Sequence, residues 1–151
     1  MKYTKEIKIN VPIEEFVKKM DSIDNLKHWH RGLISAEHIS GDYRFFGAKT
    51  KLIYRFGKQK REITETITKR NFPNEFHANY TSKISQNLQQ NFYKKTNDGY
   101  TQWTSYNQFI PLNFKMRLML FFMPNAFKTQ SQIYMQDFKN FVENGISTSH
   151  A

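Results

Sequence analysis

The sequence predicts an α+β domain in which a curved antiparallel sheet wraps around one long C-terminal helix. Three observations indicate this fold. A short strand-like segment leads into a helical pair that ends at Trp29. Strand-like runs joined by tight turns fill the middle of the chain, and one long amphipathic helix closes it. A single helix covering a curved sheet tends to leave space between them, so this order predicts a cavity for a small ligand.

The first thirty residues predict one strand and two helices. Residues 2–10 alternate between apolar and polar side chains, which is typical of a half-buried strand. Pro12 ends this strand and suits the first turn of a helix. Apolar residues from Ile13 to Ile23 recur with helical spacing, so the helix has one buried stripe. We expect a second, shorter helix over residues 21–29.

The middle of the chain predicts strands and turns with no helix between them. The pattern places strands at residues 33–41, 50–56, 61–69, 76–81, 84–95 and 100–110. The last two are joined through Asn97-Asp98-Gly99, a strong hairpin signal. Closely spaced turns without intervening helices predict an antiparallel meander.

The C-terminal region predicts a long helix over residues 125–144. Phe127, Tyr134, Phe138 and Phe141 share one face of it. Pro124 should separate this helix from the preceding segment, and Gly145 is a typical helix stop. We therefore expect a single domain over residues 1–145, followed by a frayed tail over residues 146–151.

Composition narrows the class of protein. There is no cysteine, which excludes disulfides and thiolate chemistry and suits a reducing compartment. The first residues carry no signal-peptide pattern, and the longest apolar run, 118–123, is far too short to span a membrane. We expect a soluble, cytoplasmic protein.

The formal net charge of +10 raises the question of nucleic-acid binding. The lysines are spread along strands and turns, without a block of five or six. We therefore favour a solvated basic surface, and nucleic acid is an unlikely partner on this pattern. Nothing in the sequence specifies an oligomeric state.

Five short motifs follow one another along the chain. They are Val11–Phe16 after the opening strand, Asn25–Trp29, Gly47–Lys49, Thr101–Thr104 and Met135–Glu143. In this order they resemble the START/Bet v 1-like superfamily, also called SRPBCC, in its bacterial polyketide cyclase/dehydrase-like branch. The resemblance covers essentially the whole chain. It implies a helix-grip fold: a curved seven-stranded antiparallel sheet, two short helices after the first strand, and a long helix over an internal cavity. It transfers no reaction, because members include lipid carriers, hormone receptors and only some cyclases.

Glu65 is the main candidate for chemistry. Ile63, Glu65 and Ile67 share one face of their strand, so an inward apolar face would carry the carboxylate inside. There it could act as a general acid or base, or anchor a ligand. The alternatives are a salt bridge to an inward cation such as Arg55, or a strand twist that turns the side chain to solvent. We expect an anchor, because no second titratable residue is clearly placed beside it.

The late strands offer polar groups that would suit an amphipathic ligand. Gln86 and Gln90 alternate with apolar residues, as do Ser105 and Asn107. These groups could orient a ligand, or simply satisfy one another or buried water. The residues expected to contact the ligand are Trp29, Tyr54, Glu65, Tyr80, Gln90, Trp103, Asn107, Phe109, Phe127, Tyr134 and Phe138. We expect His28, His30 and Phe122 at the cavity mouth.

No metal site or cofactor is expected. His28 and His30 do not share a helix face, and no cysteine or carboxylate spacing completes a ligand set. No phosphate-binding glycine loop or nucleophile elbow is present either.

Two functional classes remain. The first is binding or carriage of a hydrophobic or amphipathic small molecule, lipid-like or aromatic, with the run Leu118–Met123 as a mobile lid or an edge that touches a membrane transiently. The second is a cyclase- or dehydratase-type enzyme acting on a polyketide-like or aromatic substrate. In that case Glu65 would be the general acid or base, with Tyr54, Tyr80 or a histidine as partner. The lack of two convergent titratable groups favours binding.

Overall fold

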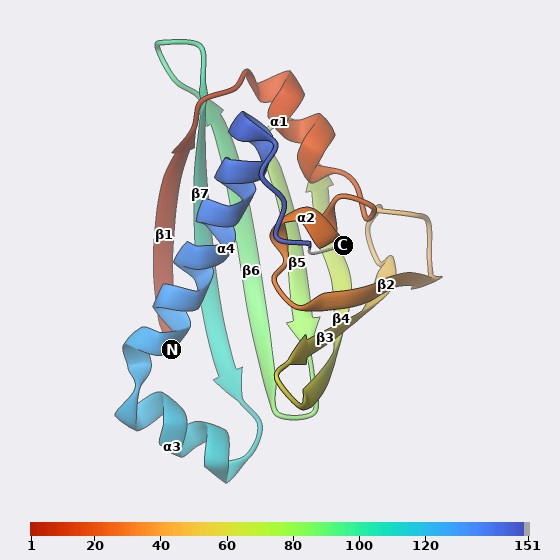
Figure 1. Cartoon of the computed structure of the whole chain (residues 1–151), viewed down its shortest axis with the longest axis vertical. Coiled ribbons are helices and arrows are strands. Elements are labelled where there is room, and N and C mark those ends of the chain that lie inside the picture. Colours follow the sequence, from red (N-terminus) through yellow and green to blue (C-terminus); the bar gives the residue numbers. More distant parts are fainter. Residues whose placement is uncertain (150–151) are drawn as a thin grey trace.

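One antiparallel sheet dominates the computed structural model, which describes residues 1–149. Its seven strands run in the order β1-β7-β6-β5-β4-β3-β2 (Figure 1). The strands are β1 Lys2–Ile9, β2 Leu33–Ser40, β3 Lys49–Phe56, β4 Gln59–Asn71, β5 Glu75–Thr81, β6 Ser85–Lys95 and β7 Thr101–Pro111. Strands β2 to β7 form the predicted meander, and β1 joins the sheet beside the last strand. The predicted α+β class and the seven-stranded sheet are confirmed.

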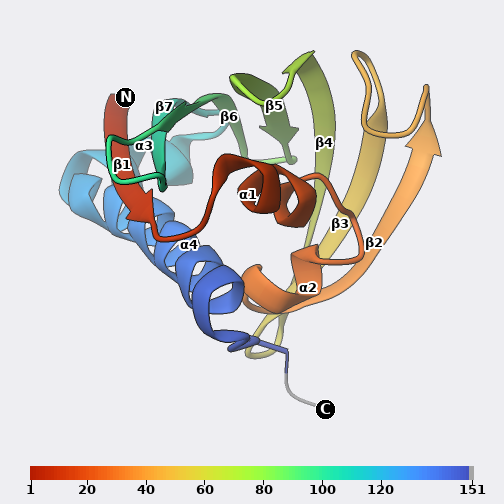
Figure 2. The same ribbon diagram turned by 90° about the horizontal axis from the view of Figure 1, so that it is seen from above.

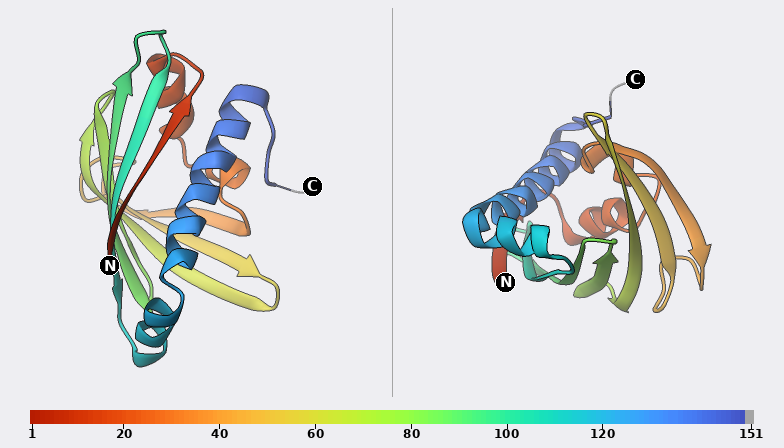
Figure 3. Two further views of the ribbon diagram at one scale, coloured as in Figure 1. Left: turned by 90° about the vertical axis from the view of Figure 1, so that its left-hand side faces the viewer. Right: turned by 90° about the horizontal axis from the view of Figure 1, so that it is seen from below.

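Four helices accompany the sheet within the described residues. They are α1 Ile13–Met20, α2 Leu26–Trp29, α3 Phe114–Phe122 and α4 Pro124–Asn144. Seen from above, α1, α2 and α4 occupy the concave side of the sheet (Figure 2). The long helix α4 crosses this side with its C-terminal part near α2, and α3 lies beneath its N-terminal end (Figure 3). The curved sheet thus has one long helix across its opening.

Local signals account for the helix boundaries. The α1 helix carries Glu14 and Glu15 in its first turn, where acidic side chains complement the helix dipole. Met123 has non-helical backbone angles between α3 and α4, and Pro124 begins α4, so the predicted break is confirmed. Gly145 ends α4 in the left-handed region, with φ of 69°.

The second helix is shorter than expected. It occupies only Leu26–Trp29 because the preceding residues form a hydrogen-bonded turn. The side-chain amide of Asn25 donates to the Lys19 carbonyl at 3.1 Å, and the backbone N–H of Asn25 donates to Ser22 Oγ at 3.2 Å. These bonds fold the chain between the two helices and set the direction of α2.

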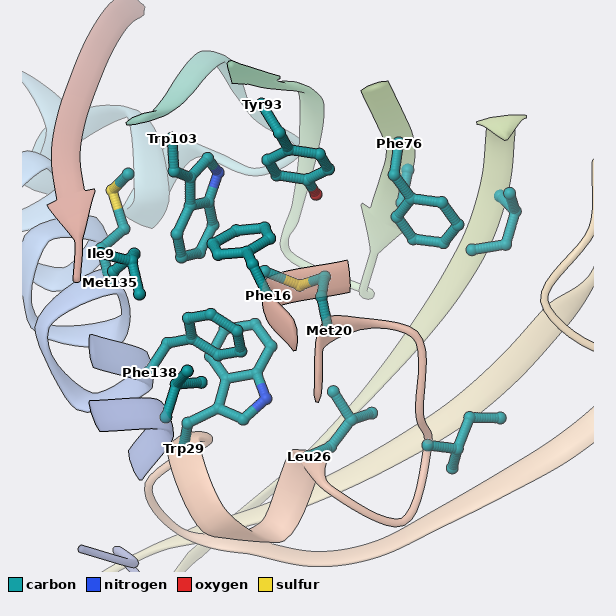
Figure 4. Packing of buried hydrophobic residues seen from close by; sticks show 14 of the residues in the cluster. Ile9, Phe16, Met20, Leu26, Trp29, Phe76, Tyr93, Trp103, Met135 and Phe138 are labelled. Atoms are coloured by element: carbon teal, nitrogen blue, oxygen red, sulfur yellow. The ribbon is translucent and has the colours of Figure 1, made fainter. Parts of the chain in front are cut away.

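A cluster of aromatic rings fills the space between α1, α2, α4 and the sheet (Figure 4). Phe138 is fully buried there, and its ring centroid lies 5.0 Å from that of Trp29, 5.2 Å from Phe16 and 5.5 Å from Trp103. Tyr93 closes the cluster against Phe16 at 4.8 Å. Tilted and edge-on pairs of this kind add to the energy of apolar burial. This cluster seals one end of the concave space.

The first residues of the expected frayed tail contact α2. Thr148 donates from its backbone amide to the His28 carbonyl at 3.0 Å, and Ser147 Oγ lies 2.8 Å from His28 Nδ1. Residues 146–149 therefore fold back onto the domain. The remainder of that expectation, residues 150–151, lies outside the described residues.

Candidate functional site: the cavity under helix α4

A cavity of about 440 Å³ lies between the concave face of the sheet and α4. The aromatic cluster bounds it at one end, through Trp29 and Trp103, and α3 bounds it at the other, through Met116 and Met119. Most of its wall is apolar. Its lining residues are Tyr3, Trp29, His30, Tyr54, Phe56, Arg61, Ile63, Tyr80, Ser82, Ser85, Asn87, Gln89, Trp103, Ser105, Phe109, Met116, Met119, Ala126, Phe127, Gln130, Ser131, Tyr134 and Met135.

A buried histidine and tyrosine form one polar pair in the wall. His30 Nδ1 lies 2.7 Å from the hydroxyl of Tyr54, and the two rings stack. Burial, helped by the positive charge of Arg44, lowers the pKa of His30 to about 3. Burial raises the pKa of Tyr54 well above its ordinary value. Both groups are therefore uncharged hydrogen-bonding groups at neutral pH.

The His30 environment predicts acid sensitivity. The pKa of His30 is lower in the folded than in the unfolded chain, so between pH 6.5 and about 3 the unfolded chain binds more protons. The free energy of unfolding should fall by up to about 3 kcal/mol between pH 7 and pH 4 through this group. Urea unfolding at several pH values measures the slope, which His30→Gln should flatten.

Tyr54→Phe is the matched control for this pH experiment. It removes the hydrogen bond to His30 but keeps the ring that buries the imidazole, so the acid sensitivity should persist. A wild-type slope in His30→Gln would show that other groups cause the acid sensitivity.

A second polar group reaches the cavity through Tyr80. Tyr80 lines the cavity, and its hydroxyl donates to Glu65 Oε2 at 3.0 Å. Burial, and then the negative charge of Glu65, raise the pKa of Tyr80 well above its ordinary value. Glu65 is only 2% exposed, and its other oxygen accepts from Arg44 Nη1 at 3.3 Å. The carboxylate thus lies behind Tyr80, outside the cavity lining.

Arg44 is the centre of a network of charges in which Arg44 and Glu65 are buried and Asp21 and Arg70 are half-buried. Its guanidinium donates to Glu65, to Asp21 Oδ1 at 3.2 Å and to the Met20 carbonyl at 3.1 Å. Arg70 also binds Asp21, at 2.6 Å and 2.9 Å. Burial alone would raise the pKa of Asp21, but the hydrogen bonds from Arg70 and Arg44 lower it below its ordinary value. Two carboxylates and two guanidinium groups thus compensate one another's charge, which a charge removed from water needs in order to be stable.

The placement of Glu65 decides between the two structural alternatives, a salt bridge and a turn of the side chain to solvent. Its side chain is buried, as its strand pattern predicts, and it forms a salt bridge. The partner is Arg44, from the loop between β2 and β3, and not Arg55, which is exposed. Arg44 has a positive φ of 64°, unusual for a residue with a side chain, so the network holds the loop in a strained backbone conformation.

The inward face of β6 differs from the prediction. Asn87, Gln89 and Asn91 point toward the concave side, and Gln90 lies on the opposite face. The expectation that Gln90 lies in the cavity was therefore wrong, because its neighbours Gln89 and Asn91 are the residues that face inward. The even-numbered residues of this strand include the apolar Leu88 and Phe92, which is why we expected them to face inward. The inward face is instead polar, and its amide side chains hydrogen-bond to one another.

These amides form a ladder beneath the cavity floor. Gln89 Nε2 donates to Asn107 Oδ1 at 3.0 Å, and Asn91 Nδ2 donates to Gln89 Oε1 at 3.0 Å. Trp103 Nε1 donates to Asn91 Oδ1 at 3.0 Å. Asn107 is inward, as predicted, but it is 4% exposed and lies under the lining instead of in it. The ladder fixes Gln89 and Trp103, whose side chains do reach the cavity.

The structure brings most of the predicted aromatic residues together. The predicted residues that line the cavity are Trp29, His30, Tyr54, Tyr80, Trp103, Phe109, Phe127 and Tyr134. Phe138 does not line it, because its ring is enclosed by the aromatic cluster. His28 stacks on Phe141 at 4.8 Å, outside the lining, and Phe122 is 73% exposed on α3, away from the cavity. The expectation of His28 and Phe122 at the mouth was therefore wrong, because α2 and α3 turn these side chains outward.

Among the lining residues that sequence reasoning did not place in the cavity are Met116 of α3 and the hairpin residues Phe56 and Arg61, and Met119 was named only as part of the run Leu118–Met123. Met116 and Met119 are three residues apart, a spacing that places them on one face of a helix. That spacing could have indicated an inward side of α3. Phe56 and Arg61 are exposed at the β3–β4 hairpin and line the cavity where it approaches solvent.

Two further features of the described residues bear on the site. Within residues 1–149, no group of three histidine or acidic side chains is arranged to hold a metal ion. No helix in this part of the chain is long and apolar enough to cross a membrane.

Comparison with solved structures identifies the fold. The structure aligns with Ara h 8.0201 at a TM-score of 0.74 and 13% identity, covering 94% of this chain and 97% of the other. It aligns with a conserved protein from Geobacillus kaustophilus at 0.79 and 15% identity, over 95% of both chains. For the protein TTHA0849 from Thermus thermophilus the TM-score is 0.76 at 10% identity, over 97% of this chain and 100% of the other.

The chain has the Bet v 1-like fold. Within this helix-grip architecture the cavity lies where the sheet curves around the last helix. The low identities limit these likenesses to the fold. No protein-family model matches the sequence, and no curated protein does.

Proposed function

We propose that this Bet v 1-like protein binds or carries a hydrophobic or amphipathic small molecule, lipid-like or aromatic, without changing it chemically. One observation carries the proposal: the cavity of about 440 Å³ has a mostly apolar wall with a few convergent polar groups. Ligand sites in proteins typically have this size and composition. Proteins of this fold often bind hydrophobic ligands, which supports the same function.

The charges of the wall indicate which ligands fit. Among the described lining residues there is an arginine, Arg61, but no aspartate or glutamate. The guanidinium of Arg61 lies 5.9 Å from the ring of Phe56 at the exposed hairpin. A neutral or anionic ligand therefore fits better than a cationic one. Its apolar part would lie against Trp29 and Trp103, and an anionic head would lie near Arg61.

The enzymatic alternative keeps one specific observation in its favour. Tyr80 lines the cavity and binds the buried Glu65 carboxylate, so a proton could pass between a substrate and Glu65 through this hydroxyl. A cyclase- or dehydratase-type reaction would need this route, because Glu65 itself does not line the cavity. Glu65 also forms a salt bridge with Arg44, which favours a structural role for the carboxylate over proton transfer.

Native mass spectrometry of the freshly purified protein tests the proposal. We expect a one-to-one adduct with a small molecule, or its formation when oleate or the aromatic anion 8-anilinonaphthalene-1-sulfonate is added. Extraction and chromatography after incubation should return the added compound unchanged. Failure of both probes to bind would contradict the proposed function, and a converted product would favour the enzyme.

A further inference from the structure

Helix α3 exposes an unusually apolar surface. Phe114, Phe121 and Phe122 are 72%, 78% and 73% exposed. Leu112, Leu118, Met119 and Met123 are also exposed around them. We call these seven side chains the α3 apolar surface. Single exposed apolar residues are common, but a continuous group this apolar marks an interaction site.

Only one side of α3 is used by the domain itself. Met116 is buried, and the helix packs against β7 and α4. Figure 3 shows α3 projecting below the end of α4. A helix that is apolar on nearly all sides normally lies in a protein core or in a lipid environment. In residues 1–149 no core surrounds it, so its outer side requires another apolar phase or partner.

The charges around this surface have a single sign. No acidic residue occurs between Asp98 and Asp137, whereas Lys115 and Arg117 are exposed on α3 and Lys128 follows on α4. The β3–β4 hairpin, at the same end of the molecule in Figure 1, adds the exposed Lys58, Lys60 and Arg61. None of these six side chains forms an ion pair with another described residue.

We propose that the α3 apolar surface docks on the surface of an anionic lipid bilayer. Phe121 and Phe122 would enter the boundary between head groups and acyl chains, while Lys115 and Arg117 meet lipid phosphates. A helix with aromatic and leucine side chains plus basic residues has the chemistry of an interfacial helix. Each basic residue near an anionic surface adds to the binding, and the surrounding lysines extend this attraction.

A second copy of the chain is the other apolar partner to consider, and the charges disfavour it. A symmetric dimer through α3 would bring Lys115 and Arg117 of both copies into one interface. Each copy also carries a formal net charge of +10. An anionic bilayer complements these charges, whereas a second copy repeats them.

Docking through α3 would also place the cavity close to the bilayer. Met119 belongs to the α3 apolar surface and lines the cavity, so one helix forms both the docking surface and a cavity wall. The docking itself does not depend on the identity of a ligand, or on there being one.

Vesicle sedimentation tests the proposal with a matched pair of variants. Phe121 and Phe46 are 78% and 76% exposed, but Phe46 lies in the loop between β2 and β3, which Figure 1 shows well away from α3. The wild type should bind phosphatidylcholine vesicles containing about 30 mol% phosphatidylglycerol, and bind pure phosphatidylcholine much more weakly. Phe121→Ser should weaken binding about fivefold or more, whereas Phe46→Ser should change it by less than about twofold.

Further experiments vary the charge of the surface and the salt concentration, and measure self-association. Arg117→Ser should weaken binding to the anionic vesicles, and raising the salt from about 0.1 M to about 0.5 M should weaken the wild type as well. Absence of vesicle binding would overturn the proposal. Equal losses in Phe121→Ser and Phe46→Ser would overturn it too, since adsorption would then not involve α3. A dimer in analytical ultracentrifugation that Phe121→Ser abolishes would assign the surface to a second copy and also overturn it.

Discussion

Glu65→Gln is expected to lower the free energy of unfolding by about 3–5 kcal/mol, the usual cost of removing one partner of a buried ion pair. The carboxylate is 2% exposed and lies 3.3 Å from the guanidinium of Arg44, which is itself 4% exposed. After substitution by a neutral amide of the same shape, Asp21 is the remaining acidic partner of Arg44. Asp21 also forms an ion pair with Arg70, so it compensates the Arg44 charge only in part. Urea unfolding of wild type and variant measures the loss.

A double-mutant cycle shows whether the loss belongs to this pair. Arg44→Gln combined with Glu65→Gln should be more stable than the sum of the two single effects predicts, because no unpaired buried charge remains between these positions. Additive effects would assign the loss to packing. A change below about 0.5 kcal/mol in Glu65→Gln would contradict a structural role for the ion pair.

The same substitution separates the two functional classes. If Glu65 only holds Arg44 and Tyr80 in place, Glu65→Gln should bind 8-anilinonaphthalene-1-sulfonate at saturation as the wild type does, under conditions where both are folded. If Glu65 is a general acid or base acting through Tyr80, any conversion of a substrate should fall by roughly 10²–10⁴-fold with binding retained. Chromatography of the recovered ligand distinguishes these outcomes.

Ser131→Trp is expected to weaken binding of the same aromatic probe by about 100-fold or more, because the indole would occupy space that a ligand needs. Ser131 lies on α4, lines the cavity and contacts the hydroxyl of Tyr3 at 2.7 Å. Fluorescence titration measures the dissociation constant.

Two control variants interpret the Ser131→Trp result. Gln136→Trp introduces the same side chain at an exposed position of α4 outside the lining, so it should bind as the wild type does. Ser131→Ala removes only the contact with Tyr3 and should also retain binding. Unchanged affinity in Ser131→Trp would place the probe outside the cavity, and the α3 apolar surface would be the next site to test.

The order of elements made the fold predictable from sequence. The opening strand, the break at Pro12, the hairpin at Asn97-Asp98-Gly99 and the stop at Gly145 are local signals that depend on few neighbours. Each matches the structure within a few residues. The aromatic face of α4 was also predictable, because helical spacing alone places Phe127 and Tyr134 on one side.

The polar part of the site was less predictable, because contacts between distant residues determine it. In β6 Leu88 and Phe92 lie on the outer face, and the inward amides Gln89 and Asn91 bind Asn107 and Trp103 of the next strand. The alternation of apolar and polar residues along a strand cannot reveal such hydrogen bonds between side chains of neighbouring strands. Arg44 lies in a loop, has a positive φ, and pairs with Glu65 21 positions further along the chain. No local signal in the sequence indicates that contact.

The pairing of β1 with β7 has a consequence for how the chain folds. The amino group of Met1 donates to the carbonyl of Phe109, a contact between residues 108 positions apart. A nascent chain therefore cannot complete its sheet until β7 has left the ribosome, and until then β1 has no strand to pair with. Sheets that depend on such distant pairing fold slowly, in roughly milliseconds to seconds. During synthesis the unpaired backbone groups of β1 would be open to chaperones or to aggregation.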